Sequence, residues 1–571
     1  MLAEPGQSAD GSDVLAEAFS VLPLISAPLP DGPAFHPLRA RQKYLEALVQ
    51  RIQNRFAEAL VTLDTARRLA PDARDVQFDI AWLDGQLRMR LGQWSEAETR
   101  LNAFIATAAA AGDRFQQARA LNDLGMGGVA RGRWDEALGR FERVLSFEDL
   151  ESLSVYASAL INAGICYTRL GEFERALAIQ RRSASLYTDR GTRTDFEHAL
   201  GQLGTTFLLQ GDPRQALPHL RQALAVSNES NLQADAALWA GNLASVNVEL
   251  GDWDEADRFN EEAKRLKAAS KTGNLVHNTL NAAKIAQGRG RLDEAARLFA
   301  EALAGAASIP GVRWTAHAGL ADGAVARSKP DEAARHFEAA LETIEKTRSE
   351  LLKTDYKLSF LTSLIQFYQH YVDTLVDQGR VERALEITES SRGRVLAERS
   401  GVAPPTRVGP GEMQKVAAGS GAVLLSYWLA PARSYLWVVT AVGVKMLTLP
   451  PADEIAGLVR QYRATINNTL ADPLASSGTA GDRLYQILVA PALPSMPPGT
   501  RVVIAADGAL HGINLRHCPS RARSATTGLK TSRSRRRRRC RCSRPRRQHR
   551  SKRRRCSCSA IRRRARRSSP R

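Results

Sequence analysis

The stretch "LGDWDEA" at residues 250–256 decides the fold, because near-copies of it recur along the chain. The copies read "LGQWSEA" (91–97), "RGRWDEA" (131–137), "LGEFERA" (170–176), "QGDPRQA" (210–216), "RGRLDEA" (289–295) and "QGRVERA" (378–384). From Gly92 to Gly290 the glycines of successive copies lie 39 or 40 residues apart. A fixed period of this length is typical of a solenoid of helical repeats.

The residues around each glycine predict a helix, a turn and a second helix. The glycine itself ends the first helix, because it adopts positive φ without strain. Seven residues earlier stands a small residue that allows close helix packing, namely Gly85, Gly125, Gly164, Gly204, Ala244 and Ala283. An apolar residue usually follows two positions after the glycine and an alanine five after it, such as Trp253 and Ala256. We interpret these aromatic and apolar residues as core between helices.

This unit resembles the tetratricopeptide repeat, at a longer period than its usual length of about 34 residues. Two degenerate copies place Asn54 and Ser328 at the glycine position, and a longer insert separates Ser328 from Gly379. We therefore expect a mostly α-helical solenoid of about eight units over residues 41–397. Such arrays commonly bind peptides or proteins on their curved surface. The units show no regular basic or asparagine-rich stripe that would name a ligand.

Charge and cysteine usage set the last residues of the chain apart. The net charge is +20, but residues 516–571 hold 23 Arg, 2 Lys and no acid, which leaves 55 basic against 60 acidic residues before them. Five of the six cysteines also lie there: Cys518, Cys540, Cys542, Cys556 and Cys558. The single cysteine of the body, Cys166, indicates a reducing compartment. With no signal peptide and no bilayer-spanning run, we expect a cytoplasmic protein and no membrane partner.

A change of pattern follows the Pro/Gly-rich linker at 398–411. Residues 412–515 contain apolar β-branched runs at 422–429 and 434–443, a third at 444–450 and a fourth from 500. Amphipathic, helix-like stretches separate the third run from the fourth. The alternation predicts an α/β domain.

The order of these segments resembles the CHAT family, caspase-like domains that follow tetratricopeptide arrays. The resemblance rests on "SSRGRVLAE", "LLSYWL", "YLWVVT", "LYQILVAP" and "VVIAADGALHGIN", and it stops at Leu515. It implies a cysteine peptidase with a His/Cys dyad on later strands, because a thiolate needs a neighbouring imidazole as base. The dyad has no counterpart here, so we expect a partial domain with unpaired strand edges and one uncovered sheet face.

We therefore predict no catalytic, cofactor-binding or metal-binding residue. His511 falls at an early strand end, and His517 and Cys518 are sequence neighbours that would point to opposite sides. Cys166 fits a small core residue. The paired cysteines of "CRC" and "CSC" are too closely spaced for an ordinary zinc site.

The segment 516–571 has three interpretations: an out-of-frame, disordered tail, a basic arm that binds nucleic acid, or a targeting tail. We favour the first, and expect nucleic acid to bind only non-specifically through this tail. Residues 1–40 are expected to be a partly disordered segment. We thus expect a protein-binding scaffold that carries a truncated CHAT-like domain and needs no cofactor. The alternatives are that the intact gene product is a repeat-regulated cysteine endopeptidase, or that the chain binds polyanions.

Overall fold

The computed structural model describes residues 29–190, 193–270, 274–307, 309–399, 409–467 and 480–513. The predictions for residues 1–28 and for the tail 516–571 lie outside the described residues. No helix within the described ranges is long and apolar enough to cross a membrane.

Helices come in antiparallel pairs, and the first and second members of a pair are called here A and B helices. The A helices are α2 (His36–Ile52), α4 (Arg74–Arg90), α6 (Arg114–Ala130), α8 (Ser154–Arg169), α10 (Arg193–Gln210), α12 (Gln233–Leu250), α14 (Val276–Gly288), α16 (Pro310–Ala326) and α19 (Ile365–Asp377). The B helices are α3 (Phe56–Leu69), α5 (Trp94–Ala110), α7 (Trp134–Leu145), α9 (Phe173–Arg190), α11 (Pro213–Glu229), α13 (Trp253–Ser270), α15 (Leu292–Gly305), α17 (Pro330–Ser349) and α20 (Val381–Arg399). Short 3₁₀ helices lie at η1 (Pro33–Phe35) and η2 (Glu148–Leu150). The described residues thus hold nine pairs, against about eight expected: one for each of the seven motif copies and one for each of the two degenerate copies.

The turns between A and B helices have the backbone conformation that the motif predicts. Gly251 has φ 76°, and the same left-handed conformation recurs at Asn54 (φ 59°) and Ser328 (φ 57°). An L-residue pays roughly 1–2 kcal/mol for this conformation, and asparagine tolerates it better than most. The two degenerate copies are therefore true turns of the array.

The small residue seven positions before the glycine has the predicted packing role. A Cβ added at Gly85 would lie 2.5 Å from Leu101, and one added at Gly125 would lie 2.5 Å from Phe141. Leu101 and Phe141 lie on the B helix of the same unit. A glycine on the A helix therefore makes room for the larger apolar side chain that faces it.

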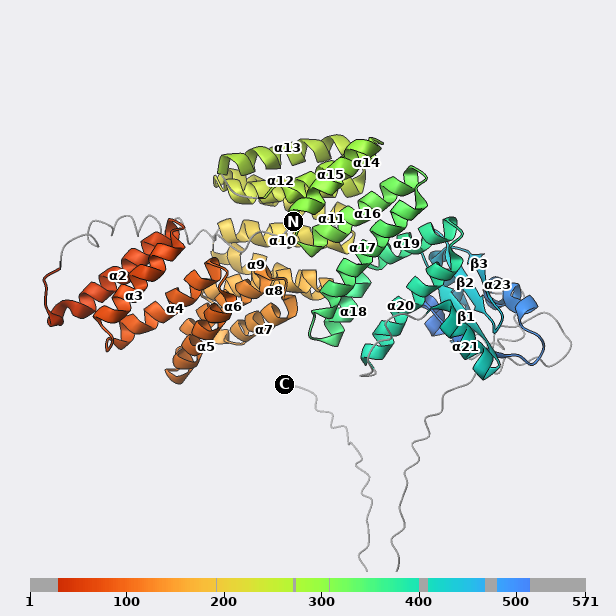
Figure 1. Ribbon diagram of the computed structural model, residues 1–571, viewed down its shortest axis with the longest axis horizontal. Helices are drawn as coiled ribbons and strands as arrows, with labels where there is room; N and C mark the ends of the chain where they lie inside the picture. Colours follow the sequence, from red (N-terminus) through yellow and green to blue (C-terminus); the bar gives the residue numbers. More distant parts are fainter. Residues whose placement is uncertain are drawn as a thin grey trace, which may run out of the picture.

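Successive A helices contact one another, whereas B helices contact mainly the A helices on either side. The layer whose members lie closer together is the inner, concave side of a curved array. The A helices thus line the inner surface, and the array curves through a superhelical turn (Figure 1).

The long insert between α17 and α19 forms α18 (Thr354–Ser363), which closes that turn. Leu351, Tyr356 and Phe360 are buried in the same apolar core as Ala176 and the residues of α7 and α8. Figure 1 shows α18 beside α7 and α8, far from them in sequence. In the sequence this insert appears only as a longer spacing between Ser328 and Gly379. Its docking joins the last units to the middle ones.

After α21 (Pro410–Ser420) the chain forms a four-stranded sheet of order β3-β2-β1-β4. Strands β1 (Ala422–Trp428), β2 (Ser434–Val439) and β3 (Val444–Leu449) are antiparallel neighbours, and β4 (Arg501–Ala505) is parallel to β1. Helices α22 (Ala452–Asn467) and α23 (Ala480–Leu488) and the 3₁₀ segment η3 (Ala490–Ser495) precede β4, and η4 (Gly508–Gly512) follows it. These positions match the expected α/β order.

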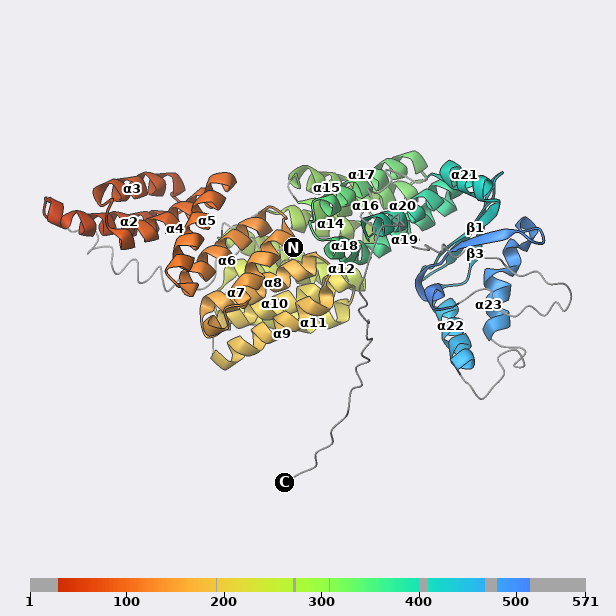
Figure 2. The ribbon, with the colours of Figure 1, turned by 90° about the horizontal axis from the view of Figure 1, so that it is seen from below.

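The expectation of an uncovered sheet face is wrong. One face packs on α22 and α23, around Leu425, Leu436 and Val438. The other face packs on the last repeat, because Tyr435, Trp437 and Val439 share a core with residues of α17, α19 and α20. Figure 2 shows α22 and α23 on one side of the sheet and α20 on the other. The terminal repeat supplies the missing cover.

Candidate functional site

The inner layer of the array carries a stripe of polar residues at equivalent positions of successive A helices. Each stands two residues before the small packing residue: Asp123, Asn162, Gln202, Asn242 and Asn281. They are 39 or 40 residues apart, in step with the repeat. Our expectation that no asparagine-rich stripe exists was therefore wrong. The stripe can be found in the sequence from the spacing of 39 or 40 residues between its members.

Several members of the stripe reach the preceding A helix. Asp123 Oδ2 accepts hydrogen bonds from Trp82 Nε1 at 2.8 Å and from Gln86 Nε2 at 3.0 Å. Asn281 Nδ2 donates to the carbonyl of Gly241 at 3.1 Å. These bonds hold neighbouring A helices in register, so much of the stripe is structural.

Two asparagine side chains on the same layer of A helices each have an oxygen that could still accept a hydrogen bond. Asn242 Nδ2 donates to Thr205 Oγ1 at 2.9 Å, but its Oδ1 is buried and finds no partner within the described ranges. The same is true of the buried Oδ1 of Asn122, next to Asp123. A buried acceptor left unpaired costs about 1–3 kcal/mol, so such atoms call for a donor.

Arg169, the last residue of α8, is an unusual cation of this part of the array. Its Nε is buried without a hydrogen-bond partner in the described part of the chain, and its guanidinium lies 5.8 Å from the ring of Trp134. Burial lowers the pKa of Arg169 to about 10. Burial likewise lowers the pKa of His277 on α14 to about 2, and the positive charge of Arg169 adds to this shift. A buried positive charge of this kind can bind an anionic group.

The docked insert contacts the array at the start of α7. The backbone N–H groups of Leu352 and Lys353 both donate to Asp135 Oδ2 at the start of α7. Asp135 is only 4% exposed as a result. The insert thus converts part of the solenoid into a closed loop of helices.

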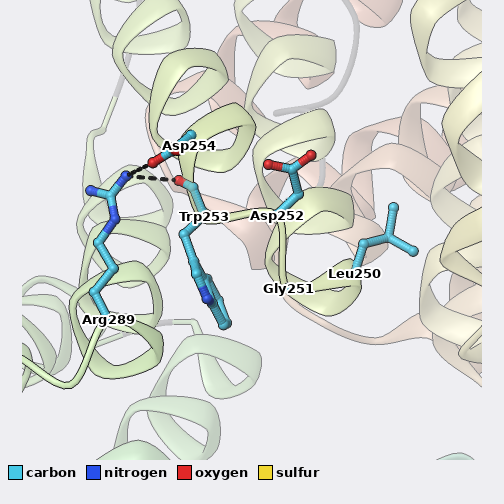
Figure 3. A pocket seen from close by; sticks show the side chains of 6 residues that line it. All are labelled: Leu250, Gly251, Asp252, Trp253, Asp254 and Arg289. Carbon is cyan, nitrogen blue, oxygen red and sulfur yellow. Dashed lines mark hydrogen bonds and ion pairs between the residues drawn. The ribbon is translucent and has the colours of Figure 1, made fainter.

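The repeat motif "LGDWDEA" at residues 250–256 borders an open hollow of about 610 Å³ between two units (Figure 3). It is lined by Leu250, Gly251, Asp252, Trp253, Asp254 and Arg289.

Arg289 of the next unit joins the two units at this hollow. Its guanidinium donates to Asp254 Oδ1 at 2.7 Å, to Asp257 Oδ2 at 2.9 Å and to the carbonyl of Trp253 at 3.2 Å. Arg131 makes the same kind of bond to Glu98 one unit after Trp94. We interpret this hollow as the seam between units.

Side chains of the sheet region serve to join it to the array. Asp507, within "AADGALH", accepts a hydrogen bond from the Leu429 N–H at 2.7 Å and pairs with Arg392 of α20 at 3.5 Å. Arg392 also pairs with Glu389 at 3.0 Å and bonds the carbonyl of Tyr427. The most specific stretch of the resemblance therefore lies at the contact with the last repeat.

The structure places the residues that were weighed for catalysis apart from one another. Cys166 is buried in the core of α8, where desolvation raises the pKa of its thiol. His511 is exposed in η4. His517 and Cys518 lie outside the described residues. Among the described residues, one group that could hold a metal ion comprises Glu197, His198 and Asp235.

Comparison with known proteins identifies the repeats. A tetratricopeptide repeat family model matches residues 155–229 and 195–269. The chain therefore contains tetratricopeptide repeats. No curated protein matches the chain in sequence.

Several solved structures are similar to part of this chain. One is a Rap protein complexed with competence and sporulation factor, with 13% identity over 60% of this chain and 99% of that chain, at TM-score 0.42. Another is aspartyl phosphate phosphatase F from Bacillus subtilis, with 12% identity over 58% and 89%, at TM-score 0.43. A third is a tetratricopeptide repeat protein from Parabacteroides merdae, with 17% identity over 50% and 98%, at TM-score 0.33. Similarity at this level concerns the fold alone.

Proposed function

We propose that this chain, whose array contains tetratricopeptide repeats, is a protein-interaction scaffold that holds a segment of a partner protein against its inner layer of A helices. The observation that carries the proposal is Arg169, whose buried Nε has no partner in the described structure. A guanidinium binds a carboxylate through two parallel hydrogen bonds, so the favoured partner segment is acidic.

The amide groups of the stripe suit the same ligand. An extended peptide presents one N–H and one C=O per residue, and each must find a partner when it is buried. The unpaired Oδ1 atoms of Asn242 and Asn122 would accept peptide N–H groups. Backbone recognition of this kind gives affinity, and the carboxylate at Arg169 gives selectivity.

A peptide-display selection against the full chain tests this proposal. We expect enrichment of acidic peptides and at least tenfold weaker binding of those peptides by the Arg169→Gln variant. The matched control is Arg175→Gln, since Arg175 pairs with Glu172 at 3.6 Å and its side chain is 62% exposed. Enriched peptides that bind both variants as well as the wild type would refute the role of Arg169. If no peptide is enriched, the inner surface is not a peptide site.

We also propose that residues 412–515 are the N-terminal portion of a CHAT-like domain without a catalytic His/Cys dyad. The strand order and the place of "AADGALH" after β4 support this proposal, and residues 409–513 contain no cysteine. In the competing hypothesis the intact gene encodes a cysteine endopeptidase. Sequencing the gene across codons 500–571 and beyond, with an intact mass of the protein, separates the two. A restored frame with a His and a Cys would favour the peptidase.

Polyanion binding is the remaining alternative, and it rests on the 25 basic residues at 516–571. It predicts RNA binding that weakens steeply with salt and disappears when residues 516–571 are deleted. Binding that survives the deletion would place any nucleic-acid site on the folded part of the chain.

A further inference from the structure

Three potential ligand groups converge between two neighbouring A helices. Glu197 and His198 lie in the second turn of α10, and Asp235 lies in the first turn of α12. One carboxylate oxygen of each acid and one ring nitrogen of His198 all lie within 4.8 Å of one another. The three residues come from two successive repeats, and they play no part in the turns or in the motif that defines the fold.

Glu197 is held in place by bonds to only one of its two oxygens. Its Oε1 accepts hydrogen bonds from Ser227 Oγ of α11 at 2.7 Å and from Trp239 Nε1 of α12. Its Oε2 is buried and has no partner among the described residues, and the whole residue is 0% exposed. A buried carboxylate oxygen that finds no donor is costly, and a cation would satisfy it.

The support around Glu197 fixes the direction of that free oxygen. The indole of Trp239 packs so tightly on Gly201 that an added Cβ would overlap the ring. This contact lets the indole N–H reach Glu197 one turn earlier on α10. His198 also packs edge-on against Trp239, with ring centroids 5.4 Å apart. Partners that orient a ligand in this way are typical of metal sites.

The acids around this oxygen also favour a cation. Asp235 and Asp195 both act electrostatically on Glu197. A cation bound between Glu197 and Asp235 would offset the repulsion between their carboxylates.

We propose that Glu197, His198 and Asp235 form a binding site for a divalent transition-metal ion, with Glu197 Oε2, a carboxylate oxygen of Asp235 and a ring nitrogen of His198 as ligands. One nitrogen and two oxygens suit Zn²⁺, with a fourth position left to water or to a ligand. The ion would link α10 to α12 and stiffen two consecutive repeats. This proposal does not depend on the proposed peptide site.

Calorimetric titration of the full chain with Zn²⁺, after treatment with a chelator, tests the site. The cysteines at 518, 540, 542, 556 and 558 would bind zinc themselves, so all five are first replaced by serine. The chain with these five serines is the background for all variants. We expect it to bind one more zinc ion per chain than the same chain carrying Asp235→Asn or His198→Asn. The matched control is His219→Asn, because His219 lies on α11 and stacks on Phe207 away from the group.

Thermal unfolding gives a second readout. Zn²⁺ should raise the Tm of the background that lacks the five tail cysteines and of His219→Asn, but not the Tm of Asp235→Asn or His198→Asn. Equal stoichiometry and equal Tm shifts in all four proteins would overturn the proposal.

If a substitution prevents folding, Co²⁺ decides the question without any variant at the site. The chain without its five tail cysteines should show the visible absorption of four-coordinate cobalt bound by nitrogen and oxygen. A chain that folds and shows no such absorption would refute the site.

Discussion

Ser359 of α18 donates a hydrogen bond from its Oγ to Glu172 Oε1 at 2.5 Å, across 187 residues of sequence. The two residues belong to units that local repeat geometry alone would not bring together. The bond lies beside Gly171, the turn glycine of the α8–α9 unit, where an added Cβ would overlap the carbonyl oxygen of Ser359. The relationship shows that the array is closed on itself by its insert.

Replacing Gly171 with alanine should undock α18. A Cβ at this position would overlap the carbonyl oxygen of Ser359, and the residue has φ 78°. The matched control is Gly251→Ala, where φ is 76° but nothing lies within 4 Å of an added Cβ. Both variants pay about 1–2 kcal/mol for the left-handed backbone. Only Gly171→Ala should also speed amide hydrogen exchange in α18, and equal exchange in the two variants would contradict the docked arrangement.

Removing the carboxylate of Asp135 should weaken the same contact from the other side. Asp135→Ala leaves the backbone N–H groups of Leu352 and Lys353 without their acceptor. We expect a loss of about 1–3 kcal/mol in the free energy of unfolding, measured with urea. Asp254→Ala is the control, because the side chain of Asp254 is 96% exposed in its ion pair with Arg289. Exposed pairs contribute about 0–1 kcal/mol, so a similar loss in both variants would count against the closure.

Glu197 should make the stability of the metal-free protein fall as pH rises. Its pKa is raised in the folded state from 4.5 to about 8, so the folded chain retains a proton that the unfolded chain releases. The resulting contribution is complete below pH 4.5 and is lost as pH rises through about 8. Glu197→Gln removes this titration and leaves Asp235, His198 and Asp195 unchanged.

Urea unfolding at pH 6, 7 and 8 with chelator present measures that difference. The variant should gain stability relative to the wild type by up to about 1.4 kcal/mol per pH unit. Parallel pH profiles for the two proteins would show that Glu197 titrates normally. Asp254→Asn, which replaces an exposed acid, is the control, and its pH dependence of the free energy of unfolding should match that of the wild type.

The sheet should unfold together with the last repeat. Trp437 is 0% exposed, and its Nε1 donates to the carbonyl of Val381 on α20 at 3.1 Å. Trp437→Ala should cost about 3–5 kcal/mol and should also accelerate amide exchange in α19 and α20. Val442→Ala, at a residue 96% exposed, should change neither. If Trp437→Ala destabilises the sheet and leaves exchange in α20 unchanged, the two parts fold independently.

Much of the fold follows from the sequence, because its rules are local. The period, the left-handed turns at Gly251, Asn54 and Ser328, and the small residues that face Leu101 and Phe141 all depend on contacts within one unit. The four strands were also predictable, because they read as short apolar runs between turn signals. The polar stripe from Asp123 to Asn281 is equally periodic; it was missed because the motif was read around its glycine and not along the A helix.

Only the tertiary structure decided which distant residues meet. The docking of α18 on α7–α9 depends on the pitch of the superhelix, which is the sum of small rotations between units that no single repeat records. The same holds for the second face of the sheet, which the last repeat covers through Trp437. Glu197 and Asp235 lie 38 residues apart, close to one period. Asp235 and His198 lie near the unpaired Oε2 of Glu197 because α10 packs against α12 in a particular way. The sequence alone does not specify that packing.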